Sequence, residues 1–143
     1  MGIRLVAFGV AMAIIAGCST SVVPVDRAVS APSERVIQRQ EPSPELGRLI
    51  VVRDSGIMGS LCLATVFIDG ARMARLETKE KAEFFLAPGE HLLGASLEGK
   101  GLCGMNARRM EREVLISQGQ TKVYRIYTSE TGMDMLPTSD TGQ

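Results

Sequence analysis

The chain has 143 residues, and its 16 basic and 16 acidic side chains give a formal net charge of zero. A balanced charge gives no general attraction to nucleic acid or to an anionic surface, so the composition argues against nucleic acid as a partner. Aromatic residues make up only 4% and tryptophan is absent, so the core must be built from Leu, Ile, Val, Met and Ala.

An apolar run covers residues 5–15 and follows a basic residue, Arg4. The run is too short for a helix that crosses a bilayer, which needs about 20 residues. It fits instead the apolar region of a secretory signal peptide, in which small residues precede the cleavage point. The residues that end the run are Ile15, Ala16, Gly17 and Cys18.

These four residues resemble, position by position, the lipobox of bacterial lipoprotein precursors: an aliphatic residue, two small residues and a cysteine. The resemblance implies cleavage between Gly17 and Cys18, with a diacylglycerol thioether on Cys18 and usually an acyl chain on the new amino group. Residues 1–17 are then the signal peptide. The alternative is an ordinary signal peptide with a chance cysteine.

Such an anchor implies a membrane as the first partner of the protein. Each buried methylene contributes about 0.8 kcal/mol, so two or three acyl chains on Cys18 would make release negligible. Ser19 follows the cysteine, where an aspartate in such lipoproteins often signals retention in the inner membrane. We therefore expect a location in the cell envelope, on the periplasmic face of the outer membrane.

The next segment, residues 18–45, is predicted to be a flexible tether. Few large apolar side chains are available there to offset the entropy of ordering the chain. Prolines also remove backbone donors and restrict their neighbours. The segment allows a short helix over residues 33–40, for which the sequence gives only weak support. We expect the tether to hold the folded domain clear of the lipid, at a typical distance of about 30 Å.

Residues 46–137 are predicted to form one all-β domain, followed by a polar tail at 138–143. Short apolar or alternating segments separated by turn signals indicate seven or eight strands. The expected strands cover residues 49–53, 63–68, 72–76, 82–87, 91–97, 110–116, 121–128 and 133–136. The first is apolar from Leu49 to Val52, which predicts burial on both faces. In the absence of a convincing amphipathic helix, we expect an antiparallel β-sandwich.

Two turns and one histidine stand out within this domain. Asp69-Gly70 is the two-residue signal of a hairpin turn with positive φ. Pro88-Gly89 predicts a second tight turn, in which proline fixes one φ and glycine supplies the left-handed residue. His91 follows that turn and is the only histidine of the chain. We expect a structural role for it, with its ring hydrogen-bonded to the backbone.

Cys62 and Cys103 remain once Cys18 is assigned to the lipid. Export would place both in an oxidising compartment, where disulfides persist. We therefore predict one disulfide between them, which would stabilise the fold by about 2–4 kcal/mol. The alternative is two buried free thiols. Two cysteines and one histidine do not readily supply a metal site, and neither a metal nor a cofactor is predicted.

No catalytic constellation emerges from the remaining motifs, and we do not expect an enzyme. Residues 94–101 nearly spell a phosphate-binding loop, but Gly101 stands where a Ser or Thr must hold magnesium. His91 would need a nucleophile and an orienting group, and no Gly-x-Ser-x-Gly motif is present. Three arginines remain as candidates for phosphate or carboxylate contacts, or for one helical turn, although a solvated mixed-charge face is the default. They are Arg108, Arg109 and Arg112.

The order of features in residues 47–128 resembles DUF2846 domains and, more loosely, PEGA-type modules. The shared features are a first strand that ends in Arg53, an aliphatic strand that ends in Asp69-Gly70, a Pro-Gly-x-His turn and a Gly-x-Thr lead into a tyrosine-bearing strand. The resemblance implies a β-sandwich at the cell envelope. The expected function is an interaction domain with an envelope protein as partner, recruited through an exposed sheet edge. The alternative is a domain that binds a periplasmic small ligand or a cell-wall fragment.

Overall fold

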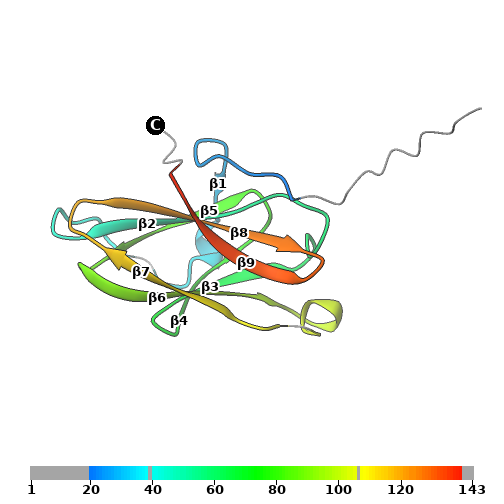
Figure 1. Cartoon of the computed structure of the whole chain (residues 1–143). Helices are drawn as coiled ribbons and strands as arrows, with labels where there is room; N and C mark the ends of the chain where they lie inside the picture. Colours follow the sequence, from blue (N-terminus) through cyan, green and yellow to red (C-terminus); the bar gives the residue numbers. More distant parts are fainter. Residues whose placement is uncertain (1–19, 39, 106, 140–143) are drawn as a thin grey trace, which may run out of the picture.

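The structure is a computed structural model that describes residues 20–38, 40–105 and 107–139. The predicted signal peptide, its predicted cleavage point between Gly17 and Cys18, and the predicted lipidation site Cys18 lie outside the described residues. The described chain forms two β-sheets that pack face to face, as Figure 1 shows. The predicted all-β sandwich is confirmed, and each predicted strand has a counterpart.

The first sheet has five strands in the order β1-β5-β2-β8-β9. They are β1 (Val29–Ser30), β2 (Gly47–Arg53), β5 (Glu80–Leu86), β8 (Thr121–Ser129) and β9 (Gly132–Thr138). The second sheet has four strands in the order β4-β3-β6-β7. They are β3 (Leu63–Ile68), β4 (Ala71–Leu76), β6 (Gly89–Glu98) and β7 (Met110–Ile116). Two short 3-10 helices complete the described elements: η1 (Ser33–Arg35) and η2 (Gly101–Cys103).

The sheets are not wholly antiparallel, which corrects the sequence-based prediction. The central strands β2 and β8 pair in parallel, and so do β1 and β5. The chain passes from one sheet to the other between β2 and β3, β4 and β5, β5 and β6, and β7 and β8. The central strand β2 is therefore distant in sequence from both of its neighbours, β5 and β8, and no hairpin dictates their relative direction.

Side chains from the inner faces of both sheets form the main core. Leu49 and Val51 of β2 enter it, together with Val66, Phe84 and Ile126, all of which are buried. The other face of β2 belongs to a second apolar cluster. The prediction that this strand is buried on both faces is thus confirmed.

Residues 20–38 supply the second cluster, so the prediction of a disordered tether is wrong for this segment. Val23, Val25 and Ala28 are buried against the outer face of the five-stranded sheet. They cover Ile50 and Val52, whose side chains point away from the main core. A few apolar side chains are sufficient to order a polar segment when they fill a face that the sheet leaves open.

The same segment then covers one edge of each sheet. β1 pairs with β5, and beyond η1 the backbone of Val36 bridges Ala74 on β4. The amide of Ile37 also donates to the carbonyl of Met73 at 2.8 Å. The folded domain therefore includes the described chain from residue 20, not only residues 46–137. The helix considered for residues 33–40 is reduced to η1, and β9 extends into the predicted tail.

Candidate functional site

An open groove of about 1380 Å³ lies at one end of the sandwich. Its walls come from the β2–β3 loop, the β6–β7 loop and the hairpin that joins β8 to β9, which meet at the right of Figure 1. We call this part of the molecule the loop end and define it as residues 54–62, 99–105, 107–109 and 128–134. Leu97, Met110 and Tyr127 also line the groove, so its lining is largely apolar.

Large apolar side chains of the loop end face solvent. The exposed fraction is 98% for Leu61, 85% for Leu102, 76% for Ile57 and 71% for Met105. Single exposed apolar residues are common, but a group of them on adjacent loops marks a site of interaction. This site was not predicted from the sequence. The apolar residues within the glycine-rich loops were the feature that indicated an exposed apolar surface.

A disulfide joins the two loops that carry these side chains. Cys62 at the end of the first loop is bonded to Cys103 in η2, with 5.4 Å between their Cα atoms. The predicted disulfide is therefore confirmed. The bond fixes the separation of the two loops and thus the width of the groove.

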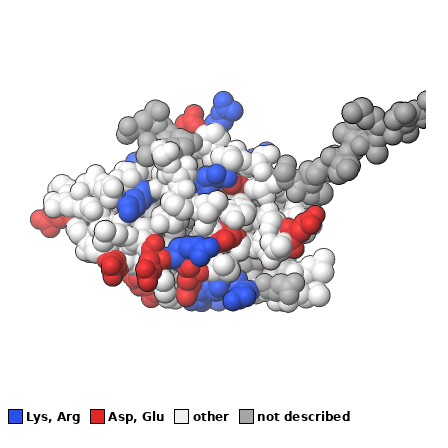
Figure 2. Space-filling view, in the orientation of Figure 1, with Lys and Arg blue, Asp and Glu red and all other residues white. Residues whose placement is uncertain are grey.

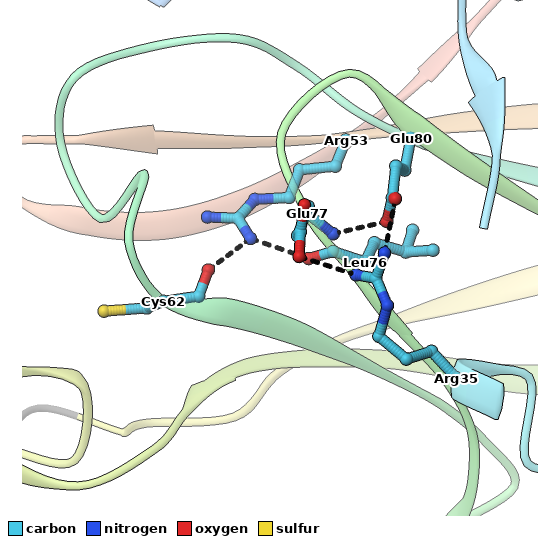
Figure 3. Close-up of polar contacts among 6 residues, drawn as sticks. All are labelled: Arg35, Arg53, Cys62, Leu76, Glu77 and Glu80. Carbon is cyan, nitrogen blue, oxygen red and sulfur yellow. Dashed lines mark hydrogen bonds and ion pairs between the residues drawn. The ribbon is translucent and has the colours of Figure 1, made fainter. Parts of the chain in front are cut away.

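A buried arginine holds the first loop from inside. Arg53 is 1% exposed, and its guanidinium donates to the carbonyls of Cys62 and of Leu76, the latter at 2.7 Å (Figure 3). It also donates to the carbonyl of Gly59 at 2.7 Å. Burial lowers the pKa of Arg53 to about 10, although the nearby carboxylates of Glu80 and Glu77 act in the opposite direction. The group stays cationic at neutral pH. Because three carbonyls accept its hydrogen bonds, the loop is fixed at both Gly59 and Cys62.

Asp54, the next residue, fixes the N-terminal segment. Its carboxylate is fully buried and accepts hydrogen bonds from the Val23 amide at 3.0 Å and from Arg125 Nε at 3.1 Å. The sequence presents Asp54 only as part of a turn. Its role depends on a contact with residue 23, which the pattern of a single strand cannot reveal.

Thr20, the first described residue, lies on the rim of the loop end. Its hydroxyl donates to the carbonyl of Thr128, a groove residue. A Cβ added to Gly56 would lie 3.2 Å from the Thr20 hydroxyl oxygen, so these two residues are in contact. The backbones of Ser21 and Ser55 exchange two hydrogen bonds of 2.7 and 3.1 Å. The N-terminal segment is thus fixed where it enters the domain.

The Asp69–His91 pair lies at the other end of the sandwich, where β3 turns into β4. His91 Nδ1 is 2.7 Å from Asp69 Oδ2, and Nε2 is 2.8 Å from the Ala87 carbonyl. Asp69 Oδ1 also accepts the Leu92 amide at 2.8 Å. The predicted hydrogen bond between the His91 ring and the backbone is present. Both ring nitrogens are engaged, so neither is free to act as a general base in this arrangement.

The electrostatics of this pair favour a charged histidine. Burial of the ring lowers the pKa of His91, but hydrogen bonds to Ala87 and Asp69 raise it, and the net shift is upward. The pKa of Asp69 is lowered, first by the Leu92 amide and then by His91. Because a neutral imidazole has only one donor, two facing acceptors select the imidazolium.

Of the two predicted turns, the first has the predicted backbone conformation and the second differs from it. Asp69 and Gly70 have φ of 50° and 81°, as the predicted hairpin turn requires. Gly89 after Pro88 has a φ of 138°, which favours glycine, although it lies beyond the left-handed helical region that the sequence predicts.

The arginines near residue 110 have separate roles rather than a common one. Arg112 in β7 pairs with Asp134 at 2.8 Å, and Arg109 lies 3.7 Å above the ring of Phe67, which it covers. Arg108 lines the groove. Figure 2 shows basic and acidic side chains interspersed on the lower face of the molecule. The mixed-charge face expected from the sequence is therefore the better description.

Among the described residues, no group of three or more His, Cys, Asp or Glu side chains is placed to hold a metal ion. No helix in residues 20–38, 40–105 and 107–139 is long and apolar enough to cross a membrane. No protein-family model and no curated protein matches the chain. The resemblances to lipoprotein precursors and to DUF2846 and PEGA-type domains stay predictions.

Proposed function

We propose that the protein is a non-catalytic lipoprotein of the bacterial cell envelope, anchored through acyl chains on Cys18, and that the loop end is its interaction site. The observation that carries the proposed site is the group of exposed apolar side chains on two loops that a disulfide joins. The lipobox supports the anchor. A disulfide that closes a loop between residues 62 and 103 supports export to an oxidising compartment.

The loop end is a better candidate for the interaction site than the sheet edges first considered. The N-terminal segment covers β5 and β4. The remaining edge strands are β7, which alternates charges from Glu111 to Glu113, and β9, which contains Pro137. Charged residues and proline on an edge strand oppose the addition of another strand. We therefore place the interaction at the loops.

A partner that presents an extended apolar surface suits the loop end better than a polar cell-wall fragment does. Polar ligands are fixed by a few convergent polar groups in a closed pocket. Here the Thr128 hydroxyl donates to the Met58 carbonyl at 2.5 Å, and the hydroxyls of Ser129 and Thr131 are 2.9 Å apart. These groups already satisfy one another, whereas the apolar side chains have no partner within the described chain that buries them.

Membrane fractionation of cells that produce Cys18→Ala tests the anchor. We expect wild-type protein in the membrane fraction and the variant in the soluble periplasmic fraction, because the acyl chains provide the membrane affinity. A Cys62→Ala/Cys103→Ala double variant is the control and should stay with the membrane. Unchanged membrane retention of Cys18→Ala would contradict the proposal.

A further inference from the structure

The described chain begins at the loop end, and this position limits where a lipid on Cys18 can lie. Thr20 is held on the rim by Thr128 and contacts Gly56. Consecutive Cα atoms are 3.8 Å apart, so the two chain steps that separate Thr20 from residue 18 can span at most about 8 Å. A free tether of residues 18–45 would have placed the domain tens of ångströms from the lipid, but residues 20–38 are packed on the sandwich.

We propose that the loop end docks on the surface of the bilayer that holds Cys18, with Ile57, Leu61 and Leu102 in the lipid interface. This inference rests on the proposed lipidation of Cys18. Acyl chains on Cys18 place that residue at the interface, and the rim at Thr20 is only two residues away. The most exposed apolar side chains of the loop end are therefore beside the lipid.

The composition of the loop end suits a lipid interface. An interfacial element buries apolar side chains about 5–10 Å into the boundary between headgroups and acyl chains. Leu61, at 98% exposed, and Leu102, at 85%, come from loops that the disulfide holds together, so both can enter one surface without a change of fold. Insertion of such side chains removes the exposed apolar area that is otherwise unexplained.

Charged groups around the groove fix which side of it faces the lipid. Lys100 and Arg108 belong to the β6–β7 loop and are suited to lipid phosphates. Glu130 and Asp134 line the β8–β9 side, where Asp134 is paired with Arg112. Within the loop end, we therefore assign the contact to the two disulfide-joined loops, the first of which includes Gly56 beside Thr20, with the carboxylate of Glu130 turned toward water.

Site-directed fluorescence in vesicles tests the docking. Full-length lipidated protein is reconstituted in vesicles of phosphatidylethanolamine and phosphatidylglycerol that carry a nitroxide quencher on the acyl chains. The same thiol-reactive fluorophore is attached to Ile57→Cys or to Leu115→Cys. Leu115 is a matched control because it is also exposed, and it lies five residues along β7 from Met110, about 17 Å from the groove.

We expect acyl-chain quenching at position 57 to exceed that at position 115 about threefold or more, since interfacial docking reaches only 5–10 Å. Adding Leu61→Ser and Leu102→Ser to Ile57→Cys should lower the quenching to the control level. Equal quenching at 57 and 115 in protein that floats with the vesicles overturns the docking and leaves the anchor intact. Protein that fails to float overturns both. A label at 57 that is shielded from water but not quenched by lipid, with crosslinks between copies, would assign the loop end to a second copy instead.

Discussion

Removal of the disulfide should destabilise the domain by an amount that follows from its position in the chain. The bond joins residues 41 apart in sequence and connects the start of β3 to η2. In the chain-entropy account, a bond that closes a loop of this size removes about 13 cal/mol/K from the unfolded state, or about 4 kcal/mol at 25 °C. A Cys62→Ala/Cys103→Ala double variant should lose stability of this order.

Urea denaturation of the double variant and its parent measures the loss, with Cys18→Ala in both so that neither carries lipid. For a urea slope of about 2 kcal/mol per molar, the midpoint should fall by about 2 M. The parent treated with a reductant is the control, and its urea midpoint should equal that of the double variant. A fall below about 0.5 M would mean that the disulfide constrains little of the unfolded chain and would refute the reasoning.

Three further predictions concern backbone fit and pH. Gly47→Ala should cost about 2 kcal/mol or more, because its Cβ would lie 2.5 Å from the Ser117 carbonyl oxygen; an unchanged urea midpoint would contradict this. Gly70→Val should cost about 1–2 kcal/mol through its φ of 81° alone, since nothing lies within 4 Å of an added Cβ; an unaltered melting temperature would contradict the turn. His91→Ala should destabilise the folded domain most below about pH 6.5, because the folded state binds the His91 proton more tightly than the unfolded state does. The loss of stability should become progressively smaller as the pH rises through the raised pKa of His91. A difference in the free energy of unfolding between variant and parent that stays constant from pH 5 to 9 would contradict the pairing with Asp69.

Local patterns in the sequence were sufficient to predict the eight longer strands and the Asp69-Gly70 turn, but not β1 or the conformation of Gly89. The apolar run from Leu49 to Val52 predicted β2. Asp69-Gly70 predicted a hairpin turn with positive φ, and the two residues have φ of 50° and 81°. Each signal lies within a few residues of the feature that it specifies. The direction of β2 relative to β8 depends on crossings between sheets, which no local pattern records.

The order of the N-terminal segment could not be predicted from its polar composition. Val23 and Val25 are too few to form a core alone, but they are sufficient to cover the outer faces of Ile50 and Val52. The double-sided apolar character of β2 was evidence that some segment must cover it. The sequence predicted that β2 is buried on both faces, but it did not indicate which residues cover the outer face.

The loop end was not predicted from the sequence, for a related reason. Leu61 and Leu102 are 41 residues apart and become neighbours only through the loops that Cys62 and Cys103 join. Arg53, which reads as the charged end of a strand, is a buried support of the first loop. These roles depend on tertiary contacts, so sequence analysis supplied the disulfide but not the surface that it organises.

Intact-mass spectrometry of the mature protein, extracted from cell envelopes, tests whether Cys18 carries the lipid anchor. We expect a chain that begins at Cys18 and carries a thioether-linked diacylglycerol, with an amide-linked acyl chain where the amino group is modified. An unmodified chain, or one that begins at any other residue, would contradict it.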